Sequence, residues 1–186
     1  MPDLNDDSIY VYRGVPQLFN LKVAMSMERP ICFSGKRIDD YVVLDQAKNA
    51  IVLNRQGNFS TVENKSTTQG QLKNPSMIIY TEGRIYVSDT GNKRINIYDE
   101  LGNYEFSFGQ KILERPTSIS FNGDRLFVCD TVKKEILIFN RKGEYQYSFN
   151  SRLENPTAVF SEENTVIVSD KALEEIKIFD RDLTKM

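Results

Sequence analysis

The sequence contains no histidine and no tryptophan, and only two of its 186 residues are cysteines. Without histidine, and with Cys32 and Cys129 far apart in the chain, a zinc site of cysteine and histidine ligands cannot be assembled. The missing histidine also removes the usual general base and the Ser–His and Cys–His nucleophile pairs. We therefore expect a protein that is not an enzyme, with no catalytic residues, no metal ligands and no cofactor.

Other features of the sequence indicate the cellular compartment of the protein and whether it contacts a membrane. No apolar run approaches the ~20 residues that a bilayer span requires, and the acidic first residues do not resemble a secretory signal. The net charge of −2 indicates no attraction of the whole chain to membranes or nucleic acid. Both cysteines lie in apolar runs, which predicts buried free thiols in a reducing compartment. We expect a cytoplasmic protein that does not contact a membrane.

What the sequence does contain is a repeat of about forty residues. Each copy begins with a proline, and an aspartate closes its second apolar run 14 residues later, or 15 residues later in the first copy. The next apolar run contains an aliphatic residue six residues after that aspartate in all four copies. The prolines are Pro30, Pro75, Pro116 and Pro156, and the aspartates are Asp45, Asp89, Asp130 and Asp170.

Each copy holds four short runs that are rich in β-branched and aromatic residues and are separated by turn residues. Four antiparallel strands, which we call a to d, make one propeller blade. The sequence thus predicts an all-β propeller over residues 1–186, with about four to four and a half blades. The expected boundaries are a partial blade at 1–24 and blades at 30–63, 75–109, 116–149 and 156–186.

A six-bladed ring at this period would need roughly 246 residues, so the predicted ring is incomplete. The sequence favours a fragment of a longer protein; partner copies that supply the missing blades, or an unusually small ring, are the alternatives. Open blade edges would allow self-association. Seven apolar positions that recur in the repeat are expected in the core, namely Phe33, Ile78, Ile119, Val159, Val87, Val128 and Val168.

The segment Tyr86–Tyr98 reads YVSDTGNKRINIY, which resembles the signature of NHL repeats. The absence of tryptophan argues against WD repeats, and the absence of a double-glycine motif argues against kelch repeats. The resemblance implies a fold like the C-terminal domain of TRIM-NHL proteins, which binds RNA or protein substrates. In those proteins the RING of the ubiquitin ligase lies outside the propeller. Related propellers carry metal-dependent lyase or lactonase sites.

The aspartate that ends strand b recurs in every copy, and two interpretations are open. The four carboxylates could form a ring that holds a cation. Alternatively, each could accept hydrogen bonds from backbone N–H groups of its own b–c loop. A residue that is present in every repeat usually serves the repeat, so we favour the structural interpretation.

Charge is distributed unevenly between the two loop classes. The d–a and b–c loops, which share one face of a propeller, sum to +7, or +3 with the four aspartates, whereas the opposite face sums to −4. A basic face is typical of a binding site for a polyanion. We therefore predict a module that binds RNA or protein; a metal-dependent enzyme or a structural oligomerisation scaffold are the alternatives. The candidate binding residues are Lys65, Lys73, Lys93, Arg94, Lys111, Arg115, Lys133 and Lys134.

Overall fold

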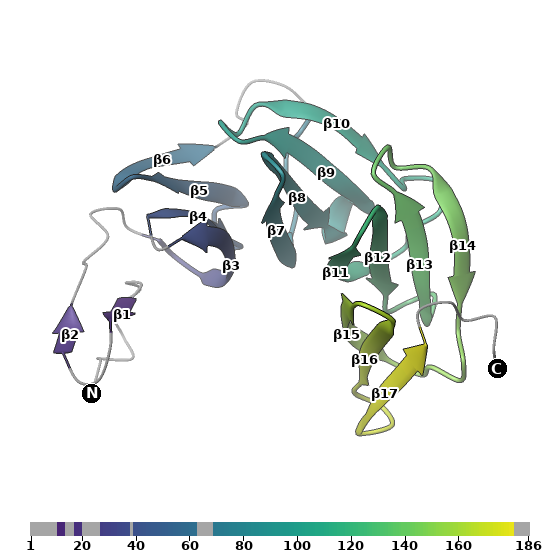
Figure 1. The fold of residues 1–186 in the computed structure, drawn as a ribbon. Helices are drawn as coiled ribbons and strands as arrows, with labels where there is room; N and C mark the ends of the chain where they lie inside the picture. The colour runs from purple at the N-terminus through teal and green to yellow at the C-terminus, as the bar shows by residue number, and fades with distance from the viewer. Residues whose placement is uncertain (1–10, 14–16, 20–26, 38, 63–68, 181–186) are drawn as a thin grey trace.

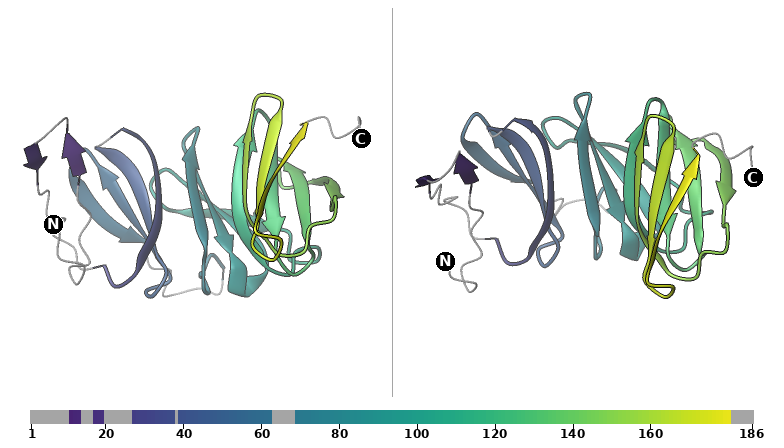
Figure 2. Two further views of the ribbon diagram at one scale, coloured as in Figure 1. Left: turned by 90° about the horizontal axis from the view of Figure 1, so that it is seen from below. Right: turned by 60° about the horizontal axis from the view of Figure 1, so that its bottom comes forward.

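The computed structural model describes residues 11–13, 17–19, 27–37, 39–62 and 69–180. Antiparallel sheets follow one another along an arc, with the first strand of each blade on the inner side (Figure 1). The predicted fold class, an all-β propeller with antiparallel blades, is confirmed. Figure 2 shows the same blades from two further directions.

Four blades follow a short hairpin of β1 (Val11–Arg13) and β2 (Gln17–Phe19), which lies in the predicted partial blade. Blade 1 contains β3 (Pro30–Arg37), β4 (Asp40–Asp45), β5 (Ala50–Arg55) and β6 (Asn58–Val62). Blade 2 contains β7 (Met77–Thr81), β8 (Arg84–Asp89), β9 (Arg94–Asp99) and β10 (Tyr104–Phe108), with a 3₁₀ turn at Thr90–Asn92. Blade 3 contains β11 (Pro116–Asn122), β12 (Arg125–Asp130), β13 (Glu135–Asn140) and β14 (Tyr145–Phe149). Blade 4 contains β15 (Pro156–Glu162), β16 (Thr165–Asp170) and β17 (Glu175–Asp180).

The spacing between proline and aspartate sets the register of the first two strands of a blade. Pro116 lies opposite Asp130 and Pro156 lies opposite Asp170, with a bulge directly after each proline. In blade 1, Pro30 also lies opposite Asp45, although one more residue separates the two. A second irregularity between Gly35 and Arg37 accommodates that extra residue, as a β-bulge does.

Apolar clusters between neighbouring blades form the core. One cluster joins blades 1 and 2, a second joins blades 2 and 3, and a third joins blades 3 and 4. Six of the seven predicted core residues are buried in these clusters, which confirms the expected register of the blades. They are Ile78, Val87, Ile119, Val128, Val159 and Val168.

The prediction that Phe33 is buried is wrong, because its side chain is 73% exposed. Its register is nevertheless the predicted one, since Phe33 pairs with Val43 just as Ile119 pairs with Val128. The Ile119 side chain packs between blades 2 and 3. On the same face of blade 1, Tyr41, Val43 and Val52 are buried with Met27 in a separate cluster, and Phe33 lies outside this cluster. Position in the repeat predicted which way the side chain points but not whether a neighbour covers it.

Both cysteines are free thiols, of which Cys129 is buried and Cys32 is half-buried. Burial raises the pKa of Cys32 to about 11 and that of Cys129 to about 12. Within the described part of the chain, no helix is long and apolar enough to span a membrane.

Candidate functional site: the basic loop face

The d–a and b–c loops lie on one face, as predicted, because backbone hydrogen bonds tie them together in every blade. The first b–c loop residue of blades 1, 3 and 4 donates its N–H to a carbonyl of the preceding d–a loop, and in blade 2 the second residue does so. The pairs are Gln46 with Arg29 (2.9 Å), Gly91 with Lys73 (2.8 Å), Thr131 with Arg115 (3.1 Å) and Lys171 with Asn155 (2.9 Å).

The aspartate that ends strand b also links these two loops, because its buried carboxylate accepts hydrogen bonds from both. Asp130 is fully buried and accepts hydrogen bonds from the backbone N–H groups of Glu114 (2.7 Å) and Arg115 (3.0 Å) in the d–a loop. It also accepts one from Lys133 (3.1 Å) in its own b–c loop. The carboxylates of Asp45 and Asp170 are held in the same way.

These contacts confirm the structural interpretation of the repeated aspartate. The sequence predicted donors from the b–c loop alone and missed those from the d–a loop. The constant spacing of the repeat could have revealed these donors, because in every copy the residue 16 positions before the aspartate donates its backbone N–H to the carboxylate. Each of these four carboxylates accepts several hydrogen bonds. Among the described residues, no group of three or more histidine, cysteine or acidic side chains could hold a metal ion.

Asp170 illustrates the electrostatics of this arrangement. Burial opposes ionisation of its carboxyl group, but the backbone N–H groups of Glu154, Asn155, Leu173 and Ala172 favour the charged form. The hydrogen bonds outweigh the burial, and the pKa of Asp170 lies below its usual value.

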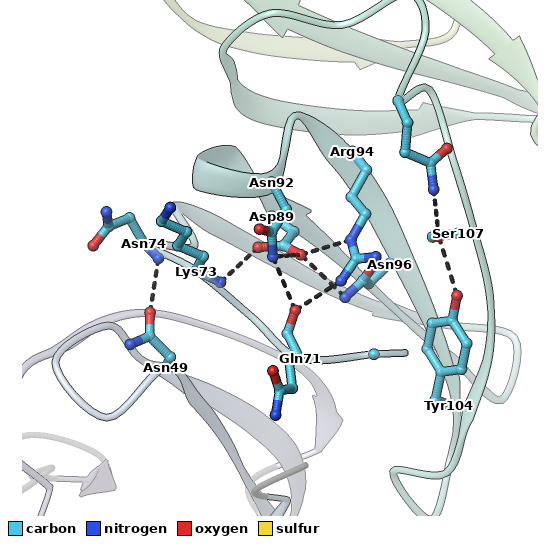
Figure 3. A network of polar contacts seen from close by, with 12 residues as sticks. Asn49, Gln71, Lys73, Asn74, Asp89, Asn92, Arg94, Asn96, Tyr104 and Ser107 are labelled. Atoms are coloured by element: carbon cyan, nitrogen blue, oxygen red, sulfur yellow. Dashed lines mark hydrogen bonds and ion pairs between the residues drawn. The ribbon is translucent and has the colours of Figure 1, made fainter. Parts of the chain in front are cut away.

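Blade 2 holds its aspartate mainly with side chains (Figure 3). Asp89 accepts one backbone N–H, from Lys73 (2.7 Å), and three side-chain donors, from Asn92 (2.8 Å), Arg94 (2.8 Å) and Asn96 (3.3 Å). The guanidinium of Arg94 also donates to the carbonyl of Gln71 (2.8 Å), and only 14% of its side chain is exposed. Arg94 therefore neutralises a buried carboxylate, and we remove it from the candidate binding residues.

The glycine of the Thr-Gly-Asn sequence is explained by a close approach within this network. A Cβ atom on Gly91 would lie 2.5 Å from the carbonyl oxygen of Lys73, which accepts the Gly91 N–H. Only glycine permits this approach of the b–c loop to the d–a loop.

The other predicted basic residues lie on the loop face in different states. Lys73, Lys93, Lys111 and Arg115 are exposed and Lys133 is half-buried, and none of the five forms an ion pair with a residue that the structure describes. Lys134 is exposed and pairs with Glu154 at 2.6 Å. Lys65 lies outside the described residues.

The unpaired basic residues come from neighbouring loops of blades 2 and 3. The described residues of these loops (69–76, 90–93, 109–115 and 131–134) include six basic residues and a single acidic one, Glu114. The structure therefore places a cationic surface on this part of the loop face, which we call the basic patch: Lys73, Lys93, Lys111, Arg115 and Lys133.

On the opposite face, two arginines are engaged in contacts between blades. Arg55 pairs with Asp40 at 2.9 Å, donates to the carbonyl of Glu100 at 2.8 Å and lies 4.5 Å from the ring centre of Tyr80. These side chains line a groove of about 470 Å³ between blades 1 and 2.

Arg141 of blade 3 links blades 2 and 3 with contacts of the same three kinds. It pairs with Glu82 and donates to the carbonyl of Gly123. Its Cζ atom lies 5.2 Å from the ring centre of Phe121. These two arginines hold neighbouring blades together, whereas the residues of the basic patch form no ion pair with a described residue.

Comparison with known proteins supports the fold and leaves the family open. No family model matches the sequence, and no curated protein matches it. Among solved structures, a chain of the nidogen/laminin complex aligns with a TM-score of 0.73 and 17% identity, over 86% of this chain and 62% of that chain. This chain is a β-propeller.

Two lyases share the same fold. Streptogramin B lyase aligns with a TM-score of 0.63 and 11% identity, over 84% of this chain and 56% of its own. A catalytically inactive histidine-to-alanine variant of virginiamycin B lyase from Staphylococcus aureus, solved with quinupristin, aligns with a TM-score of 0.64 and 15% identity, over 83% and 56%. The propeller described here spans about three fifths of the length of these structures.

Proposed function

We propose that this chain is a non-enzymatic binding propeller that recognises an anionic macromolecule through its basic patch. One observation carries the proposal, namely that five basic residues on neighbouring loops of one face form no ion pair with a described residue, in loops where six basic residues accompany one acidic residue. Arg55 and Arg141 on one face are held by carboxylates and aromatic rings. The lysines of the basic patch have no such partners among the described residues, and exposed unpaired cations are what a polyanion site requires.

The partner that we place first is a protein with an acidic surface. The similar propeller in the nidogen/laminin complex is part of a protein–protein assembly, which supports this choice by analogy of fold alone. The resemblance to the substrate-recognition domain of TRIM-NHL ubiquitin ligases supports it too, and also makes single-stranded RNA the second candidate. Both ligands would contact the patch through anionic groups.

An enzymatic role is less well supported. The inactive lyase variant differs from the active enzyme by the loss of a histidine, and the present chain contains no histidine at all. The aspartates that recur at the ends of the b strands are saturated with hydrogen bonds, as shown for Asp130. We also propose a cytoplasmic location, which the free thiols of Cys32 and Cys129 support.

A titration of the purified chain with two labelled probes tests the proposal. The probes are poly-glutamate, as a model of an acidic protein surface, and a single-stranded RNA homopolymer, both at low salt. We expect fluorescence anisotropy to report saturable binding of at least one probe. Binding of poly-glutamate alone favours the protein ligand, and much tighter binding of RNA favours the second candidate. Absence of binding to both would overturn the proposed function.

A further inference from the structure

The groove between blades 1 and 2 has a volume of about 470 Å³, which lies within the range of ligand pockets in proteins. Blade 1 forms one wall, with Arg37 and Asp39 from its a–b loop, and blade 2 forms the other, with Glu100 and Leu101 from its c–d turn. Arg37 has 74% of its side chain exposed, and Leu101 is 69% exposed. The groove is therefore open to solvent and can admit one part of a ligand whose remainder stays outside.

The wall from blade 1 contains a departure from the repeat. Blade 1 has one more residue between Pro30 and Asp45 than the other blades have, and the bulge between Gly35 and Arg37 accommodates it. Arg37 ends this bulge and donates two hydrogen bonds to the carboxylate of Asp39, both of 3.1 Å. Bulges often re-aim a side chain next to a functional site. The extra residue thus builds a wall that the repeat itself does not require.

The wall from blade 2 departs from the repeat at Glu100. Glu100 and Arg141 of blade 3 each stand 11 residues after the aspartate that ends strand b. Arg141 lies over the ring of Phe121 in its own blade, at 5.2 Å from the ring centre. In blade 2 the equivalent ring is that of Tyr80, and Arg55 of blade 1 lies over it instead. Two departures from the repeat therefore meet at one groove, as is typical of functional positions.

Glu100 is the carboxylate of this lining that has no cationic partner. The two arginines of the lining pair with its two aspartates, at 3.1 and 2.9 Å. The nearby Lys36 lies 5.4 Å from the ring centre of Tyr80. Glu100 is exposed and forms no ion pair with a residue that the structure describes, and the exposed Leu101 follows it directly. A carboxylate beside an exposed aliphatic side chain complements a cation that has an apolar neighbour.

We propose that this groove binds a lysine or arginine side chain of a peptide segment that carries an apolar side chain next to it. The cation pairs with Glu100, and the apolar neighbour packs on Leu101. The peptide backbone stays at the open mouth of the groove. The groove lies on the face opposite the basic patch, so this proposal is independent of the proposed function.

Binding of short peptides to the full chain tests the proposal. The probes are Gly-Leu-X-Leu-Gly peptides that are amidated at the C-terminus and carry a neutral fluorophore at the N-terminus, with arginine, lysine or glutamine at X. We expect fluorescence anisotropy to show binding of the two basic peptides and roughly tenfold weaker binding of the glutamine peptide, which cannot form a charge-assisted hydrogen bond with Glu100. Equal binding of the glutamine peptide, or no binding of the basic peptides, would overturn the proposal.

Three variants locate the binding site. Glu100→Gln removes the charge and keeps the shape of the side chain, so it should weaken binding of the arginine peptide about tenfold. Asp124→Asn is the matched control, because Asp124 is an exposed carboxylate in the a–b turn of blade 3 on the same face, and it should leave the affinity unchanged. Asn58→Trp fills the groove without changing the net charge and should abolish binding.

Equal losses in the Glu100→Gln and Asp124→Asn variants would overturn the proposal, because they would show attraction to the overall charge. Full affinity in the Asn58→Trp variant would overturn the groove as the site. Competition with N-acetylarginine amide tests whether a peptide is required: a small compound that binds as tightly as the arginine peptide would overturn the peptide as the occupant. Circular dichroism establishes that the variants are folded.

Discussion

The Nε atom of Arg94 lies 2.8 Å from Oδ2 of Asp89, whose side chain is completely buried. In the other blades the residue five positions after the aspartate is Ala50, Glu135 or Glu175, and backbone N–H groups satisfy the carboxylate. In blade 2, side chains donate most of the hydrogen bonds to the carboxylate. A residue that the sequence offers as a ligand-binding cation is therefore part of the scaffold.

This relationship predicts opposite results for two adjacent basic residues. Arg94→Ala removes the cation beside a buried carboxylate, and we expect it to lower the free energy of unfolding by about 3 kcal/mol. Lys93→Ala should change it by less than about 0.5 kcal/mol, because Lys93 is exposed and unpaired among the described residues. Urea unfolding of both variants makes the comparison. Equal effects of the two substitutions would mean that Arg94 does not stabilise the loop.

The core between blades provides a second matched pair. Ile119 and Phe33 occupy the same position of the repeat, but Ile119 is 1% exposed and Phe33 is 73% exposed. Ile119→Ala should cost about 2–5 kcal/mol of unfolding free energy, whereas Phe33→Ala should cost less than about 1 kcal/mol in the monomer. The measurement is made at a concentration below that of any association. A large loss for Phe33→Ala under those conditions would show that a part of the chain covers it.

The lowered pKa of Asp170 predicts how stability depends on pH. Because the folded state holds the charged form more strongly than the unfolded chain does, the contribution of Asp170 is present above the unfolded pKa of about 3.9 and is lost as pH falls through the lower folded pKa. Stability should therefore decline below about pH 4. Asp170→Asn should flatten this decline when unfolding is measured between pH 7 and pH 3.

A control for the pH experiment is Asp124→Asn at an exposed position of an a–b turn. This variant should keep the pH dependence of the wild type. An Asp170→Asn curve that follows the wild-type curve at every pH would show that hydrogen bonds to this carboxylate do not stabilise the fold.

The repeat made the strands and their register predictable, because the proline-to-aspartate spacing and the alternation of apolar residues are local properties of the sequence. The pairing of Pro116 with Asp130 and the burial of Ile119 follow from them. The exposure of Phe33 could not be derived in this way, since it depends on which parts of the protein lie against that side of blade 1. Arg94 shows the corresponding limit for the candidate site. Its carboxylate partner Asp89 is only five residues away, but its guanidinium is also held by the carbonyl of Gln71 in the d–a loop, 23 residues earlier, and such a contact between loops cannot be read from the local sequence.

The basic patch is tested most sharply by matched charge reversals. Lys93→Glu with Lys111→Glu changes two exposed residues of the loop face, and Arg37→Glu with Lys142→Glu changes two exposed residues of the opposite face by the same charge. Arg37 pairs with Asp39 in its own turn, whereas Lys36 is unsuitable because it lies 5.4 Å from the ring centre of Tyr80 in the next blade. The backbone at position 93 is left-handed, with φ of 57°, and Glu174 occupies the equivalent position of blade 4 with φ of 55°, so glutamate fits there. Arg55 and Arg141 are unsuitable controls because they hold neighbouring blades together.

The most direct measurement is the salt dependence of binding to the anionic probe, made on the wild type and on both double variants. If the basic patch binds the anionic groups, log K falls linearly with log salt for the wild type. In the Lys93/Lys111 variant, binding weakens, and with single-stranded RNA as the probe the slope becomes shallower by about 0.7 for each phosphate that the protein no longer neutralises. The Arg37/Lys142 variant should keep both the affinity and the slope of the wild type. Equal reductions of affinity in the two double variants would contradict the account, because they would show attraction to overall charge and no binding site on the loop face.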